Sequence, residues 1–359
     1  MKTIIKKNHS KILYIFFIFL SLNMFFFSTV KCEAKAFDIN NIDISRPFEI
    51  NFNKNEVIDD GFRKAFFELI SFILNSTDQK KLKQVKISEI KGMVESFSIK
   101  EEKFIDETYF VKFDVAFNRK KVLNYLEKLN IFPSIPLKKK ILFIPVLIDG
   151  QSKDLLVFTN NKFYNQWNTN IKSFHLIDYI LPTEDLEDLN LIKSKYEYIE
   201  EYNFKDISNK YNLDDSIIAL IFKDENKIRV LSKIIFKDDI ILKNQSFSNL
   251  NINNESEVED IIISLKLIYE DYWKNLNQIN TSIRLPLNIK LSNNNYSKIL
   301  EFEKILNETD LIYNFFIFKF DQNFTYYRII FNGTPSAFLK SMDNNDFNFD
   351  TQNKIWVLR

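Results

Sequence analysis

The chain has 359 residues and a formal net charge of +1, with 37 phenylalanines, 4 glycines and 1 cysteine. A single cysteine excludes a disulfide within the chain, and glycines this few and this scattered exclude a glycine-rich phosphate-binding loop. The length is enough for about two or three hydrophobic cores.

The first 36 residues have the features of an export signal. Lysines precede an apolar run from Ile12 to Val30, and the small-x-small sequence Ala34-Lys35-Ala36 follows that run. This order predicts a signal peptide over residues 1–36 that is cleaved before Phe37. The lysines of the basic region are Lys2, Lys6, Lys7 and Lys11.

The same stretch leaves one alternative open and disfavours another. The apolar run approaches the ~20 residues that span a bilayer, so an uncleaved N-terminal anchor is the alternative to cleavage. Lipid attachment at Cys32 is disfavoured, because Lys31 stands where a lipoprotein signal needs a small residue.

Removal of the signal would change the charge of the chain. Six lysines and one glutamate lie in residues 1–36, so the formal charge would fall from +1 to −4. A mildly acidic protein is poorly suited to nucleic acid, whose phosphates are bound by lysine and arginine. We therefore expect an exported protein of the periplasm or cell envelope that has no nucleic-acid partner and touches the membrane only through an uncleaved signal segment.

The rest of the chain divides into three expected domains of an α+β protein. Pro133 and Pro136 mark the boundary between the first two. The expected domains are an N-terminal α+β domain at 37–132, a middle α/β domain at 138–278 and a ferredoxin-like C-terminal domain at 281–359.

The first domain is expected to contain a helix, a hairpin and a second helix. Apolar side chains recur at helical spacing over Phe62–Ile73, and over Tyr109–Phe117 they alternate as in a half-buried strand. Phe97 and Ile99 are placed on the partner strand, with Lys100–Glu107 as a charged connection. The second helix has Val122, Leu123, Leu126 and Leu129 on one face.

The middle domain is expected to contain a strand that is covered on both faces. Ile141–Ile148 is a continuous apolar run, and Pro145 within it indicates an edge or a bulge because proline has no N–H. Further strands are predicted at Ser216–Phe222, Lys227–Phe236 and Ile240–Phe247. A long helix from Glu255 to about Asn277 closes the domain.

The C-terminal domain has the clearest pattern, β-α-β-β-α-β, which is the ferredoxin-like order. One strand of its central hairpin, Leu311–Phe320, is apolar on both faces. A domain of this kind leaves one sheet face open to water, so we expect the helix at 255–277 or the middle domain to cover that face.

Seven short pieces of sequence are spread along the chain in a distinctive order, and none of them is a catalytic motif. They are Phe62-Arg63-Lys64-Ala65, Val94-Glu95-Ser96-Phe97, Val115-Ala116-Phe117-Asn118, Ile144-Pro145-Val146-Leu147, Leu181-Pro182-Thr183-Glu184-Asp185-Leu186-Glu187-Asp188, Gly333-Thr334-Pro335 and Trp356-Val357-Leu358. With these pieces the chain resembles the exported bacterial family called domain of unknown function 2066, whose members are often richer in Ala, Gly, Arg and Leu. That family has no established activity, so the resemblance implies export and a domain order but no chemistry. The middle domain also resembles small α/β domains of periplasmic accessory proteins, such as those of cell-wall synthase activators and the Tol system.

Residues able to support catalysis are scarce. His175 is the one histidine after the signal, and no Gly-x-Ser-x-Gly elbow is present, so neither a serine triad nor a histidine-rich zinc site is expected. We expect His175 to have a structural place at a strand edge. The three tryptophans, Trp167, Trp273 and Trp356, are expected to anchor cores rather than to bind sugar.

Carboxylates are the remaining candidates for chemistry. The densest cluster is Glu184, Asp185, Glu187 and Asp188. We interpret it as the first turn of a helix capped by Thr183, since a helix dipole stabilises acidic groups there. Calcium binding or catalysis is the alternative, although no Asp-x-Asp-x-Asp-Gly loop is present.

The sequence therefore favours a non-catalytic envelope protein that works in binding or assembly through contact with another envelope protein. It predicts no catalytic, cofactor-binding or metal-binding residue. The alternative is a hydrolase of cell-wall glycan, which requires two facing carboxylates ~5–10 Å apart in an open cleft.

Overall fold

The computed structural model describes residues 37–359, apart from positions 173, 226, 237, 238, 249–251, 253, 282, 283 and 310. The predicted signal peptide at 1–36, and Cys32 with it, lies outside the described residues. Helices account for 36% of the structure and strands for another 36%, and the strands form several separate sheets. This composition confirms the predicted α+β class. Among the described helices, none is both long and apolar enough to cross a membrane.

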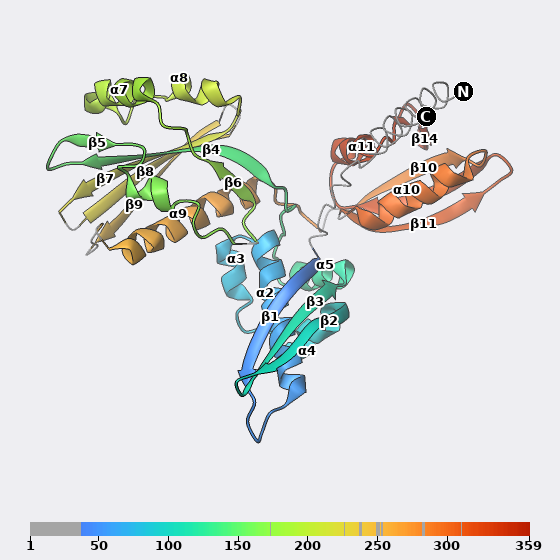
Figure 1. The fold of residues 1–359 in the computed structure, drawn as a ribbon. Coiled ribbons are helices and arrows are strands. Elements are labelled where there is room, and N and C mark those ends of the chain that lie inside the picture. Colours follow the sequence, from blue (N-terminus) through green and yellow to red (C-terminus); the bar gives the residue numbers. More distant parts are fainter. Residues whose placement is uncertain are drawn as a thin grey trace, which may run out of the picture. The chain divides into compact units, whose positions relative to one another are not determined.

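The N-terminal part contains a three-stranded antiparallel sheet in the order β1-β3-β2 (Figure 1). Its elements are β1 (Asp38–Pro47), α2 (Lys54–Ile73), α3 (Ser76–Lys81), α4 (Ile87–Met93), β2 (Val94–Ile105), β3 (Thr108–Phe117) and α5 (Arg119–Lys128). The two predicted helices correspond to α2 and α5, and the predicted strand to β3. The sequence analysis did not predict strand β1, because consecutive asparagines and a register shift interrupt its alternation of apolar and polar residues.

Helix α2 packs closely against β3. Its buried side chains, including Phe62 and Phe66, share one core with Phe113 and its neighbours on β3. A Cβ atom at Gly61 would lie 2.8 Å from the Phe113 ring. Glycine is therefore needed at this approach, although it weakens a helix by about 1 kcal/mol relative to alanine.

The hairpin formed by β2 and β3 is longer than predicted. Lys100–Ile105 continues β2 instead of forming a charged connection, and Asp106 and Glu107 make the turn. Their φ angles are 47° and 57°, and two successive residues with positive φ are typical of a type I′ turn. The charged residues are compatible with a strand because β2 is an edge strand, where such side chains reach water.

The middle part is a six-stranded sheet covered on both faces. Its elements are β4 (Lys139–Asp149), β5 (Asp154–Leu156), α6 (Lys162–Gln166), β6 (Ile177–Ile180), α7 (Leu186–Ser194), α8 (Lys205–Ser208), β7 (Ser216–Asp224), β8 (Lys227–Phe236), β9 (Asp239–Ser248) and α9 (Glu255–Leu276), with 3₁₀ turns at Tyr196–Tyr198 and Asn209–Tyr211. The strand order is β5-β4-β7-β8-β9, and β6 also pairs with β4. Helices α7 and α8 lie on one face and α9 on the other (Figure 1). The doubly covered strand predicted at Ile141–Ile148 is thus confirmed.

Pro145 lies inside this sheet, so its predicted place at an edge or a bulge is wrong. Strand β4 pairs with β7 through this position without a register shift. On the other side, β4 pairs with β6 only up to Leu142 and with β5 only from Leu147. Because the amides of Leu142 and Gly150 point toward β7, alternation directs position 145 into the gap between β6 and β5. The Asn161 amide occupies that gap and donates to the Pro145 carbonyl at 3.1 Å, so the missing N–H interrupts no ladder.

The C-terminal part is a five-stranded sheet with two helices. Its elements are β10 (Leu285–Ser292), α10 (Tyr296–Glu308), β11 (Ile312–Phe320), β12 (Phe324–Phe331), α11 (Pro335–Asp343), β13 (Phe349–Asp350) and β14 (Trp356–Leu358). The strand order is β11-β12-β10-β14-β13, with β10 and β14 parallel. The predicted element order is present, with the short β13 added. The likeness to ferredoxin-like folds and the three domain boundaries stay predictions.

The expected cover over the C-terminal sheet is wrong. Helices α10 and α11 close one face, but on the other face the side chains of Phe316 and Phe318 of β11 are 46% and 45% exposed. Helix α9 buries its own apolar side, including Val258 and Leu265, against the middle sheet. Among its remaining apolar side chains, Ile263 and Leu267 are 51% and 46% exposed, so they do not pack on the C-terminal sheet either.

Candidate functional site

The acidic cluster singled out by sequence is a helix start joined to a lysine. Asp185, not Thr183, caps α7, because its carboxylate accepts the Glu187 amide at 2.7 Å. Lys210 Nζ lies 3.2 Å from Asp185 and 2.6 Å from the buried Asp188. The hydrogen bonds to Asp188 and Asp185 raise the pKa of Lys210, and the Glu187 amide, then Lys210, lower the pKa of Asp185. The cluster therefore lies at the start of α7, as the sequence analysis predicted. Only the predicted capping residue, Thr183, was wrong.

Glu184, another carboxylate of this segment, makes a contact that does not involve Lys210. Glu184 accepts the backbone amide of Thr159 at 3.2 Å, away from the Lys210 pair. Within the described ranges, no group of three or more His, Cys, Asp and Glu side chains is arranged to hold a metal ion.

The tryptophans take up core positions to different degrees. Trp167 is fully buried and stacks on Phe143, with ring centroids 3.7 Å apart. Trp273 stacks on Phe236 at 5.3 Å and donates to the Leu137 carbonyl at 2.7 Å. Trp356 is partly buried in the C-terminal core. The expectation of core anchors is confirmed most fully for Trp167.

Helix α9 carries buried charges that the sequence analysis did not single out. Glu270 accepts the amides of Leu176 and Ile177, at 3.0 and 2.9 Å, where β6 begins. Lys274 donates to the Ser71 carbonyl in the last turn of α2. Burial raises the pKa of Glu270 and lowers that of Lys274. The sequence could have revealed these two charges, because they are four residues apart on the apolar side of α9. Their hydrogen bonds to backbone groups of distant segments indicate a structural role.

Lys266, one turn earlier on α9, has a different environment. Its ammonium lies 5.6 Å from the Trp167 ring and 5.7 Å from the Tyr179 ring. Burial lowers the pKa of Lys266 to about 8, and Glu270 opposes part of that shift. His175, two residues before β6 rather than at its edge, has a pKa lowered to about 4, first by burial and then by nearby lysines.

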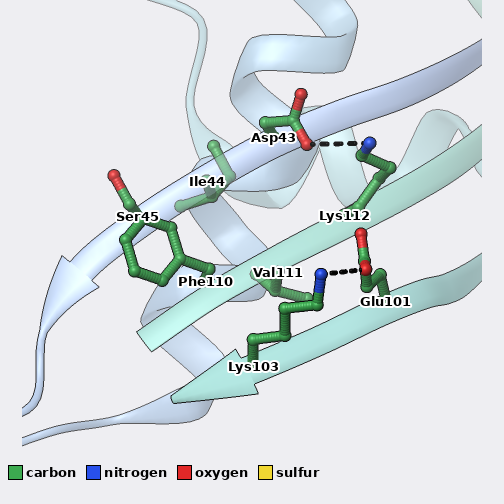
Figure 2. Close-up of a pocket in the computed structure, with 8 residues that line it drawn as sticks. All are labelled: Asp43, Ile44, Ser45, Glu101, Lys103, Phe110, Val111 and Lys112. Atoms are coloured by element: carbon green, nitrogen blue, oxygen red, sulfur yellow. Dashed lines mark ion pairs between the residues drawn. The ribbon is translucent and has the colours of Figure 1, made fainter. Parts of the chain in front are cut away.

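The open face of the N-terminal sheet holds a shallow hollow of about 260 Å³ (Figure 2). Phe110 lies in it beside Ser45 of the neighbouring strand. Asp43 pairs with Lys112 at 3.6 Å, and Lys103 pairs with Glu101. The charged groups that line this hollow are thus paired with each other, Asp43 with Lys112 across two strands and Lys103 with Glu101 along β2.

The open face of the C-terminal sheet combines rings with cations, and we call it the aromatic face. Lys290 Nζ lies 4.5 Å from the Phe324 ring centroid, and Lys319 Nζ lies 4.7 Å from that of Tyr326. Tyr326 is central, since the rings of Phe318 and Phe324 lie 6.1 and 6.3 Å from it. The aromatic face comprises Lys290, Phe316, Phe318, Lys319, Phe324, Tyr326 and Arg328.

A register shift in β11 creates part of this arrangement. Between Ile317 and Lys319 the pairing with β12 slips, so that Phe318 and Lys319 both lie against Tyr326. One residue pair away, Phe316 is directly opposite Arg328. Among the described residues, Arg328 has no carboxylate within ion-pair distance. Asp321, the acidic group of the hairpin turn, accepts the amides of Asn323 and Phe324 at 3.0 and 2.9 Å and pairs with Lys319 at 3.7 Å.

Comparison with known proteins adds no name to this arrangement. No family model matches the chain, and no curated protein is significantly similar to it. The resemblance to domain of unknown function 2066 therefore stays a prediction.

Proposed function

We propose that this is an exported envelope protein that works in binding or assembly, and that another envelope protein binds to its aromatic face. The observation that carries the proposal is the exposure of Phe316 and Phe318, 46% and 45%, beside the cations of Lys319 and Arg328. Aromatic and arginine side chains are the groups that contribute most to protein interfaces.

The charge of the aromatic face indicates the chemistry of the partner. Lys290 and Arg328, with Lys319 partly balanced by Asp321, make this face basic, whereas the chain after the signal has a formal charge of −4. A partner segment that bears acidic groups next to apolar side chains would match the cations and the rings together. The acidic segment at Glu184–Asp188 lends no comparable support to a glycan hydrolase, because Lys210 holds both Asp185 and Asp188.

Site-specific photocrosslinking in exporting cells tests the proposal. A photoreactive phenylalanine analogue at Phe316 should yield an adduct with one envelope protein, and Arg328→Glu should reduce that adduct about tenfold or more, as expected for an interface arginine. The matched control is the analogue at Phe110, a phenylalanine of similar exposure, 41%, on the N-terminal sheet. Recovery of the chain alone, or equal adducts from both positions, would contradict the proposal.

A further inference from the structure

Strand β9 is an unusual sheet edge for this molecule. It is the last strand of the middle sheet and pairs with β8 over its full 10 residues without a register shift. The other long edges described here, β1, β2 and β11, each carry a register shift. The remaining edges, β5, β6 and β13, have 3, 4 and 2 residues. Bulges and short lengths are the usual protection of an edge against pairing, and β9 has neither.

The first half of β9 exposes apolar side chains next to this free edge. Ile240 and Leu242 are each 60% exposed, on the sheet face opposite to α9. Ile241 points the other way and packs with the α9 core. The edge thus offers unpaired backbone groups together with uncovered apolar surface, which are the two features that attract a further strand.

The sequence of this half strand is complementary to itself. It reads Asp239-Ile240-Ile241-Leu242-Lys243, so an antiparallel copy centred on Ile241 places Asp239 opposite Lys243 and Ile240 opposite Leu242. Directly opposite residues in an antiparallel pair share one sheet face, and residues 239 and 243, like 240 and 242, do lie on the same face of β9. The overlap therefore contains two pairs of opposite charge, three apolar pairs, including Ile241 with its own copy, and no like-charge pair.

We propose that β9 pairs antiparallel with β9 of a second copy of this chain, about a two-fold axis at Ile241. Such pairing joins two middle sheets into one continuous sheet and uses the same patch on both copies, as a two-fold dimer requires. Centring the pair one residue further, on Leu242, preserves neither ion pair, because Asp239 then faces Gln245. A short overlap of this kind makes a weak, concentration-dependent dimer rather than an obligate one.

Charge exchange tests the pairing on the intact, signal-processed protein. Light scattering from about 1 to about 500 µM should show the mass of the wild type rising toward twice that of one chain. Asp239→Lys and Lys243→Asp should each weaken dimerisation at least tenfold, since each places like charges opposite one another. The double exchange Asp239→Lys/Lys243→Asp should restore the dimer.

Two further variants separate pairing from general surface effects. Leu242→Lys should abolish the dimer, whereas Leu300→Lys, at a leucine of 50% exposure on α10, should not. In the signal-processed protein, from which Cys32 is removed with residues 1–36, Ile241→Cys should form a disulfide-linked dimer, because opposite Cα atoms in an antiparallel pair are about 4.5–5.5 Å apart, within disulfide range. Gln245→Cys should not crosslink. A protein that stays monomeric throughout, or a double exchange that fails to restore what the single changes remove, overturns the inference.

Discussion

The N-terminal and C-terminal sheets each have one face covered by helices and one open face, yet the two open faces differ in chemistry. On the N-terminal sheet, Lys112 pairs with Asp43 and Lys103 with Glu101. On the C-terminal sheet, Lys290 lies over the ring of Phe324, and Lys319 lies over the ring of Tyr326 while it also pairs with Asp321 at 3.7 Å. Charges that already have partners gain little from a new one, whereas cations over exposed rings can recruit an acidic, apolar partner. Lys290 over its ring and Arg328 without an ion pair among the described residues keep this contrast, which supports the proposal that the aromatic face is the binding surface.

The largest expected effect separates the two faces of the N-terminal sheet. Phe113 faces α2 and is 1% exposed, and Phe110 faces the hollow and is 41% exposed. Phe113→Ala should lower the free energy of unfolding by about 3–5 kcal/mol, whereas Phe110→Ala should change it by less than about 0.5 kcal/mol. Urea unfolding followed by circular dichroism measures both. Similar losses from the two changes would mean that the hollow is part of a core.

Binding of a hydrophobic dye should distinguish the two open faces. The double change Phe316→Ser/Phe318→Ser should remove most of the dye fluorescence of the native protein, because these rings dominate the uncovered apolar surface of the aromatic face. Phe110→Ser is the matched change on the N-terminal sheet and should leave the fluorescence nearly unchanged. If the two proteins lose fluorescence equally, the contrast between the faces is lost.

A buried titratable group, His175, should differ from the exposed charges of both open faces in how it affects stability. Burial, with the charges of Lys266, Lys274 and Lys172, lowers the pKa of His175 to about 4, against about 6.5 in an unfolded chain. The stability that comes from keeping this imidazole neutral is therefore complete above about pH 6.5 and is lost as the pH falls toward 4. His175→Gln should remove this dependence, so the melting temperature of the wild type should fall relative to the variant between pH 6.5 and 4. The raised pKa of Glu270 acts in the opposite sense but is present in both proteins. Parallel pH profiles would show that the histidine is not desolvated.

The smallest effect is expected for the paired charges of the N-terminal open face. Asp43 is 70% and Lys112 is 34% exposed, and their atoms are 3.6 Å apart. Lys112→Ala should therefore lower the free energy of unfolding by less than about 1 kcal/mol, and added salt should make the difference smaller still. A loss of several kcal/mol in urea titration would show that the pairs hold the sheet together.

Local pattern was enough for most elements but not for edges. Alternation over Tyr109–Phe117 and helical spacing over Phe62–Ile73 predicted β3 and α2, because these periods follow from backbone geometry alone. The charged half of β2 was misassigned, because strand pairing depended on β3 and on a two-residue turn rather than on its own apolar residues. Likewise, Pro145 was compatible with a central position only because β6 stops and β5 starts on either side of it.

The candidate site shows the same division. The sequence by itself determined that Leu311–Phe320 is apolar on both faces and that Asp239–Lys243 has opposite charges at its ends. Only the tertiary structure decided that α9 buries its apolar side elsewhere, that Phe316 and Arg328 face water together, and that β9 ends its sheet. Burial is a property of what packs against a segment from distant parts of the chain, so a strand that is apolar on both faces reads the same in a sequence whether it becomes a core or a binding surface.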